Sequence, residues 1–122
     1  MSKTILVVED TVDTRELLHL HLTKEGFTVI IAADGGEGLY MAKSDHPDLI
    51  ITDINMPNLS GTDMIKQLRE EPVFAKTPII VLSAYGKGIA EEAIEAGATK
   101  TIQKPFEFDA LIAQVKSLLN QP

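Results

Sequence analysis

Asp53 ends the apolar stretch LIIT, where a carboxylate is costly to place unless a nearby group stabilises its charge. Other short apolar runs in the chain also end in groups suited to that task. The acid pair Glu9 and Asp10 follows TILVV, Ser83 ends PIIVL, and Lys104 follows TKTIQ. Carboxylates bind Mg²⁺, while a hydroxyl and a lysine stabilise phosphoryl oxygens. These residue types fit the transfer of a phosphoryl group to a carboxylate, with Asp53 as the nucleophile.

The elements that carry these residues alternate between short β-rich apolar runs and longer segments of helical periodicity. The predicted strands are Thr4–Glu9, Thr28–Ala32, Leu49–Asp53, Pro78–Ser83 and Thr99–Gln103, and the predicted helices span about 12–25, 36–44, 61–70, 89–96 and 108–119. Strict alternation predicts an α/β domain with a flavodoxin-like parallel sheet of strand order 2-1-3-4-5 and helices on both faces. Because ILVV, LII and IIVL are apolar at every position, those strands are expected at the centre of the sheet, and the polar TKTIQ at an edge.

All strands of such a sheet point the same way, so their carboxyl ends meet at one edge, where ligands bind. The tips of the first and third strands would lie about 4.8 Å apart. Carboxylates that close raise one another's pKa unless a cation lies between them. One Mg²⁺ together with Lys104 would balance the negative charges of Glu9, Asp10 and Asp53. Lys104 lies two strands, about 10 Å, from Asp53, a distance that its long stem can reach.

The composition predicts a single domain over residues 1–122, with no room for an output domain after the last helix. The net charge of −7 argues against a nucleic-acid surface. There is no cysteine, which excludes disulfides, thiol nucleophiles and zinc–thiolate sites. No run approaches the roughly 20 apolar residues of a membrane span, and the start of the chain is unlike a signal peptide. The chain is therefore expected to be a cytoplasmic protein.

At these residues the sequence resembles the receiver domain, the phosphoacceptor module of response regulators in bacterial two-component systems. VVED matches the family's acid pair, and TDINMPNLSG matches its phosphoacceptor strand and the loop that follows. VLSA carries the hydroxyl position thirty residues past the aspartate, and KPF carries the lysine motif. Each motif alone is weak. All of them occur in order, at the family's spacing, and they cover essentially the whole chain.

The resemblance implies a role for each matching residue. Asp53 would become the aspartyl phosphate, Ser83 would donate to a phosphoryl oxygen, and Lys104 would pair with the phosphate. The implied Mg²⁺ ligands are Asp10 directly, Glu9 largely through water, Asp53, and the backbone carbonyl of Asn55. The family also often has a cis peptide bond before the proline of KPF, and a loop glycine at the position of Gly61.

One position departs from the family's pattern. Receivers usually carry Tyr or Phe three residues before the lysine, an aromatic that swings inward on activation, and Thr101 stands there instead. The usual readout through the fourth helix, fifth strand and fifth helix therefore lacks its aromatic. Tyr85, two residues after Ser83, becomes the candidate for a gate or switch.

The resemblance implies a stand-alone response regulator rather than an enzyme with a separate substrate. A histidine kinase or phosphotransfer protein would phosphorylate it in a Mg²⁺-dependent reaction, and an unknown downstream protein would read the changed surface. Nucleic-acid and membrane partners are not expected. The oligomeric state is open between a monomer and a phosphorylation-dependent dimer.

Two other functions stay open. A receiver-shaped adaptor that never takes phosphate generally lacks an acid or the lysine, whereas this chain keeps all five positions of the site. An aspartate-nucleophile phosphohydrolase typically places its nucleophile after the first strand in a DxD arrangement. Here Asp10 is followed by Thr11 and Val12, so the second acid of that motif is absent.

Overall fold

The computed structural model describes residues 2–83 and 88–120 of the chain. Its strands are β1 (Thr4–Val8), β2 (Thr28–Ala32), β3 (Leu49–Asp53), β4 (Ile79–Ser83) and β5 (Lys100–Gln103). Its helices are α1 (Val12–Lys24), α2 (Gly35–Asp45), α3 (Gly61–Arg69), α4 (Ile89–Ala96) and α5 (Phe108–Leu118), with a 3₁₀ helix, η1, at Pro72–Phe74. The ends of the predicted strands and helices are confirmed to within one residue, and η1 is an addition that the periodicity missed. None of the helices in the described ranges is long and apolar enough to cross a membrane.

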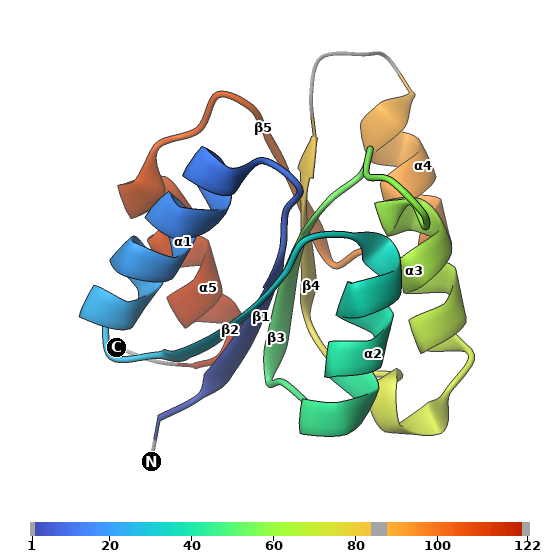
Figure 1. Cartoon of the computed structure of the whole chain (residues 1–122), viewed down its shortest axis with the longest axis horizontal. Coiled ribbons are helices and arrows are strands. Elements are labelled where there is room, and N and C mark those ends of the chain that lie inside the picture. The colour runs from blue at the N-terminus through green and yellow to red at the C-terminus, as the bar shows by residue number, and fades with distance from the viewer. Residues whose placement is uncertain (1, 84–87, 121–122) are drawn as a thin grey trace.

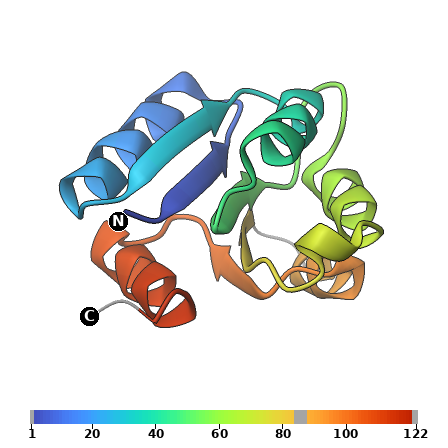
Figure 2. The same ribbon diagram turned by 90° about the horizontal axis from the view of Figure 1, so that it is seen from below.

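The strands form one parallel sheet of order β2-β1-β3-β4-β5. Helices α1 and α5 cover one face of the sheet, and α2, α3 and α4 cover the other (Figure 1). The view from below in Figure 2 shows the same three layers, with the sheet between the two groups of helices. The predicted flavodoxin-like fold is confirmed, with β1, β3 and β4 at the centre and β5 at an edge.

Two hydrophobic clusters, one on each face of the sheet, form the core. Along β1, Ile5 and Val7 pack with α1 and α5, while Leu6 and Val8 pack with α2, α3 and α4. All four of these side chains are fully buried. Burial of a side chain of this size stabilises the fold by about 1.5–3 kcal/mol. The central strands are therefore anchored on both faces, which makes their carboxyl ends a rigid base for polar groups.

Arg69, the last residue of α3, joins three segments at the amino-terminal edge of the sheet. Its Nη1 donates to the carbonyl oxygen of Phe74 (2.6 Å), and its Nε donates to that of Gly97 (3.0 Å). The side chain of Arg69 packs closely on Gly97, since a Cβ on Gly97 would lie 2.7 Å from Cγ of Arg69. Gly97 also has a φ of 123°, which favours glycine at this position. Burial lowers the pKa of Arg69. The guanidinium nevertheless stays charged, and two of its N–H groups donate to backbone carbonyls.

We expect Arg69→Met to lower the free energy of unfolding by about 1–3 kcal/mol, because two carbonyls lose a charged donor while the aliphatic stem is kept. Urea denaturation measures the change. Lys66→Met, at an exposed position of the same helix, is the control and is expected to stay within about 0.5 kcal/mol of the wild type. Equal losses in the two variants would contradict the joining role of Arg69.

Candidate functional site

The candidate site lies at the carboxyl edge of the sheet, where parallel pairing brings the strand tips level. Glu9 and Asp10 follow β1, Asp53 is the last residue of β3, Ser83 is the last residue of β4, and Lys104 follows β5. The backbone N–H of Lys104 donates to the carbonyl oxygen of Ser83 (2.7 Å), which ties the exit of β5 to the tip of β4.

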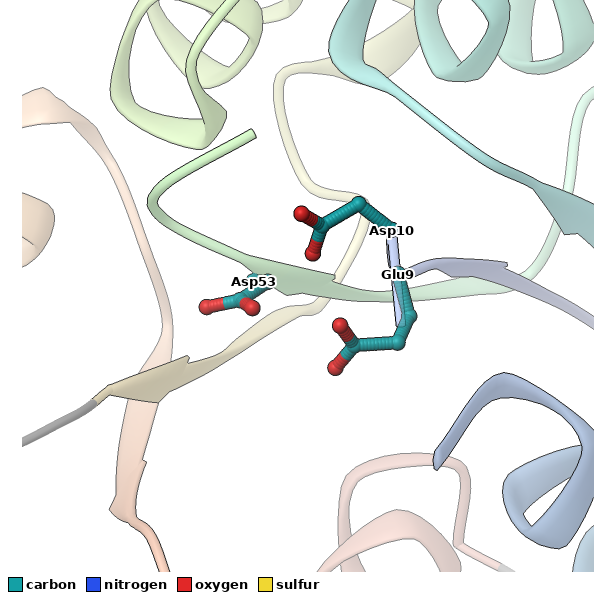
Figure 3. Close-up of side chains that lie close together, drawn as sticks. All are labelled: Glu9, Asp10 and Asp53. Carbon is teal, nitrogen blue, oxygen red and sulfur yellow. The ribbon is translucent and has the colours of Figure 1, made fainter. Parts of the chain in front are cut away.

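Three carboxylates, those of Glu9, Asp10 and Asp53, converge at this edge, and we refer to them as the acid cluster. Each offers an oxygen, and these oxygens lie within 4.8 Å of one another. Figure 3 shows the three carboxylates facing the same space from the end of β1 and the tip of β3. Glu9 is buried, Asp53 is half-buried and Asp10 is exposed. Solvent therefore reaches the acid cluster past Asp10.

Glu9 carries its carboxylate into a fully buried position. Its Oε2 accepts a hydrogen bond from the backbone N–H of Thr11 (3.1 Å), and its Oε1 accepts one from Nζ of Lys104 (3.2 Å). Burial raises the pKa of Glu9, and the charge of Asp53 adds to the rise, against the opposing effects of Thr11 and Lys104. The ionised form of Glu9 therefore costs folding free energy that a further cation would offset.

Lys104 bridges two members of the acid cluster. Its Nζ lies 3.0 Å from Oδ2 of Asp53 and 3.2 Å from Oε1 of Glu9. Burial lowers the pKa of Lys104, but the hydrogen bond and charge of Asp53, followed by those of Glu9, outweigh burial and raise the pKa overall. Lys104 therefore stays a cation and neutralises part of the cluster. Its peptide bond to Pro105 is cis, as the resemblance led us to expect.

The backbone around Asp53 fixes the other side of its carboxylate. Oδ1 of Asp53 accepts a hydrogen bond from the backbone N–H of Ile54 (2.7 Å), and the hydroxyl of Thr52 donates to the carbonyl oxygen of Asp53 (2.8 Å). A Cβ on Gly61 would come 2.0 Å from that carbonyl oxygen, so α3 begins directly against the tip of β3. Asn55 lies exposed in the intervening loop.

Two residues that the sequence patterns did not assign to the site support Glu9. The backbone of Thr11 binds its carboxylate, and Nη1 of Arg15 donates to its carbonyl oxygen (2.9 Å). A cation is unfavourable in the first turn of a helix, because the amino-terminal end of the helix dipole is positive. Arg15 stands in the first turn of α1 despite this cost, and that unusual position is the signal that could have identified it. The sequence could not reveal the Thr11 contact, because any residue there offers the same N–H.

Of the two residues expected to matter for the readout, Thr101 and Tyr85, the structure describes Thr101. Thr101 lies within β5 and pairs with Val81 of β4. Tyr85 lies outside the described residues. A gating role for Tyr85 therefore stays a prediction.

The acid cluster fits a magnesium ion. Mg²⁺ binds oxygens at about 2.0–2.1 Å, so neighbouring ligands on one ion lie about 3 Å apart and opposite ones about 4 Å apart. Separations of up to 4.8 Å suit an ion held by some carboxylates directly and by others through water. The donors are hard oxygens, the type that Mg²⁺ prefers.

We expect Glu9→Gln to stabilise the Mg²⁺-free protein at neutral pH. The pKa of Glu9 is raised in the folded state above its ordinary value of 4.5, so its ionisation at neutral pH weakens the fold, and glutamine keeps the shape without the charge. The gain should shrink as the pH falls through the folded-state pKa and vanish below the ordinary pKa of 4.5, because the wild-type carboxyl is then protonated in both the folded and the unfolded state. Urea denaturation at neutral and acid pH measures the difference.

Glu16→Gln, at an exposed position of α1, is the control for this variant and should change stability little at either pH. Mg²⁺ is expected to stabilise the wild type more than Glu9→Gln, because the variant has lost a carboxylate of the acid cluster. A variant that is less stable than the wild type at neutral pH would show that the pairing with Lys104 outweighs the burial of charge.

The family is decided by comparison with known proteins. The family model of the response regulator receiver domain matches residues 5–116. The chain belongs to this family. Receiver domains are signalling modules of two-component systems, and phosphorylation and Mg²⁺ binding are typical of them. The resemblance found in the sequence motifs is therefore confirmed.

Relatives and solved structures of this receiver agree with that assignment. Response regulator MprA of Mycobacterium ulcerans (strain Agy99) is 39% identical over 122 residues, which are 99% of this chain and 52% of MprA. The alkaline phosphatase synthesis transcriptional regulatory protein PhoP of Bacillus subtilis (strain 168) is 37% identical over 122 residues, 99% of this chain and 50% of PhoP. The chain thus spans about half the length of these curated relatives.

Two solved structures match the receiver over most of both chains. The chemotaxis response regulator CheY4 of Vibrio cholerae has a TM-score of 0.90 at 30% identity, covering 97% of this chain and 99% of CheY4. The signal receiver domain of a signal transduction histidine kinase from Syntrophus aciditrophicus has a TM-score of 0.92 at 30% identity, covering 98% of this chain and 91% of that domain.

Proposed function

We propose that this receiver accepts a phosphoryl group on Asp53 from a phosphohistidine of a histidine kinase or phosphotransfer protein, with Mg²⁺ as its cofactor. The placement of Asp53 carries the proposal. Its Oδ2 lies 3.0 Å from Nζ of Lys104, and an oxygen of its carboxylate lies within 4.8 Å of those of Glu9 and Asp10. A nucleophile, a fixed cation and a metal-binding cluster thus share one edge of the sheet.

The chemistry follows from these contacts. The bond between phosphorus and the imidazole nitrogen of the donor breaks, a bond between phosphorus and a carboxylate oxygen of Asp53 forms, and the leaving imidazole takes up a proton from water. Lys104 pairs with the Asp53 carboxylate before the transfer and neutralises phosphoryl oxygens during it. Attack of water on phosphorus later releases inorganic phosphate and restores the carboxylate.

The remaining site residues would bind the transferred group and the metal. Ser83, at the tip of the neighbouring strand and 4% exposed, would donate its hydroxyl to a phosphoryl oxygen. Asp10 would bind Mg²⁺ directly and Glu9 largely through water, together with Asp53 and the carbonyl of Asn55. When bound, Mg²⁺ neutralises charge on the phosphoryl oxygens.

The output of the receiver would be a changed surface that a downstream protein recognises. The aspartyl phosphate adds charge and acceptor oxygens beside Ser83 and Lys104, and so favours one of two surface states. The chain would catalyse its own phosphorylation and dephosphorylation rather than turn over a separate substrate. Its oligomeric state, its cytoplasmic location and its action without an output domain stay predictions.

Phosphorylation by a small acyl-phosphate donor, with Mg²⁺ or with a chelator, tests the proposal. We expect intact-mass spectrometry to find one phosphoryl adduct per chain in Mg²⁺, and hydroxylamine to remove it, because hydroxylamine cleaves acyl phosphates. A chain that binds no Mg²⁺ and takes up no phosphoryl group would instead be a receiver-shaped adaptor. Multiple turnovers of a phosphate ester would indicate a phosphohydrolase.

A further inference from the structure

The loop between β3 and α3, which carries Asn55, touches the start of α2 at its outer end. We define this outer end, Asn58 and Leu59, as the loop tip. Nδ2 of Asn58 donates to Oδ2 of Asp34, 24 positions earlier in the chain and just before α2 (3.1 Å). Asp34 lies between the predicted second strand and the predicted second helix, and the proposed chemistry gives it no role.

Asp34 is a fixed acceptor because it also caps α2. Its Oδ1 accepts a hydrogen bond from the backbone N–H of Glu37 (2.8 Å), and Oε1 of Glu37 accepts one from the N–H of Ala33 (3.0 Å). The N-cap bond holds one oxygen of the Asp34 carboxylate in place, and the bond from Ala33 to Glu37 fixes the backbone just before it. The N–H of Glu37, followed by the amide of Asn58, lowers the pKa of Asp34, so Asn58 donates to an ionised carboxylate.

Backbone packs directly on backbone beside this hydrogen bond. A Cβ on Gly35, the first residue of α2, would lie 1.9 Å from the carbonyl oxygen and 2.7 Å from the carbonyl carbon of Leu59. The side chain of Leu59 packs against the core cluster on the α2, α3 and α4 face. The loop tip is therefore held by a charged hydrogen bond, a close backbone contact and an apolar side chain.

The loop tip adopts a backbone conformation that depends on such support. The N–H of Leu59 donates to the carbonyl oxygen of Pro57 (2.8 Å), closing a three-residue turn, and Asn58 at its centre has a φ of 71°. Tight turns of this kind are strained and persist where the surroundings hold them. Asn tolerates a positive φ better than most residues do.

The other end of the loop is fixed at the site. The N–H of Ile54 donates to Oδ1 of Asp53, and the carbonyl oxygen of Ile54 accepts from the N–H of Gly61 (2.8 Å). Asn55, Met56 and Pro57 lie between the two fixed ends, and a proline restricts the backbone of the residue before it. The orientation of the peptide groups around Asn55 therefore depends on where the loop tip is held.

We infer that Asp34 and Asn58 are positioning residues, which hold the loop so that the carbonyl of Asn55 is available to Mg²⁺. The inference rests on the proposed function, because Asn55 matters here through metal binding. The Mg²⁺ affinity of the acid cluster then depends on a contact made by Asp34, which follows β2. This edge strand provides none of the cluster's carboxylates.

Asn58→Gly tests the inference, because glycine accepts the positive φ and removes the side-chain amide. We expect the Mg²⁺ dissociation constant, obtained from the rise in melting temperature on titration with MgCl₂, to increase about threefold to tenfold, the worth of one hydrogen bond. Asp34→Ser should have a similar effect, since serine still caps α2 but is too short to reach Asn58. Asn120→Gly, which replaces another asparagine of positive φ (56°), should leave the affinity unchanged.

A double variant, Asp34→Ser with Asn58→Gly, distinguishes the effect of the hydrogen bond between the two residues from the separate effects of each substitution on Mg²⁺ affinity. If the Asp34–Asn58 hydrogen bond acts as inferred, Asp34→Ser with Asn58→Gly binds Mg²⁺ no more weakly than either single variant. Additive losses would overturn the inference. An Asn58→Gly protein that is less stable but binds Mg²⁺ as tightly as the wild type would also overturn it. A wild type with no Mg²⁺ response would overturn the proposed function and this inference together.

Discussion

Asp53→Asn is expected to abolish phosphorylation of this receiver while leaving its fold intact. The amide has no anionic oxygen with which to attack phosphorus, so we expect complete loss of the acyl-phosphate adduct. Asparagine keeps the size of the side chain, and its oxygen can still accept the hydrogen bond that the N–H of Ile54 gives to Asp53 (2.7 Å). Removing one charge from the acid cluster should hold or raise the stability without Mg²⁺. Intact-mass spectrometry and urea denaturation measure the two outcomes.

Two further variants control for this result. Asp10→Asn keeps the nucleophile but loses the exposed carboxylate of the cluster, so we expect slower phosphorylation that higher Mg²⁺ partly restores. Asp45→Asn, at an exposed position at the end of α2, should be labelled as the wild type is. An adduct that persists on Asp53→Asn with wild-type stability would assign the phosphoacceptor to another carboxylate and remove Asp53 from its role.

The fold and the meeting point of the polar groups could be predicted because two independent patterns agree. The central strands are apolar at every position, so a polar residue at such a strand's end marks where the chain leaves the core. The parallel order then brings those ends to one edge. Asp53 and Ser83 are placed by both patterns, and Lys104, which follows the polar edge strand, is placed by the parallel order alone. The structure has these three residues at the tips of β3 and β4 and after β5.

The finer contacts could not be predicted, because they depend on packing between segments far apart in the chain. The complete burial of Glu9 and the shared bonding of Lys104 follow from how side chains fit between strand tips, which periodicity does not describe. The contact between Asp34 and Asn58 joins two loops that lie 24 positions apart in the chain, and no sequence pattern pairs them. The reactive residues at the carboxyl edge of the sheet could be predicted from the sequence, while the residues that position them could not.

Gly61→Ala is expected to lower the free energy of unfolding by about 3 kcal/mol or more, because its new Cβ has no room. The Cβ would lie 2.0 Å from the carbonyl oxygen of Asp53, and 3.0 Å from its carbonyl carbon and from Cα of Ile54. These are backbone atoms, so the clash is relieved by moving α3 or the tip of β3. Either movement strains the hydrogen bond from the N–H of Gly61 to Ile54 (2.8 Å) and displaces the nucleophile.

The same variant should also be phosphorylated more slowly, since a misplacement of about 1 Å in a reacting group can cost roughly 100-fold in rate. Gly36→Ala is the matched control. Its Cβ meets nothing nearer than Oδ1 of Asp34 at 3.4 Å, so the better helix former should stabilise the exposed start of α2 by about 0.5–1 kcal/mol. Urea denaturation and the rate of phosphoryl uptake measure both variants. If Gly61→Ala loses stability but is phosphorylated at the wild-type rate, the reacting carboxylate of Asp53 does not depend on the backbone contact between α3 and β3.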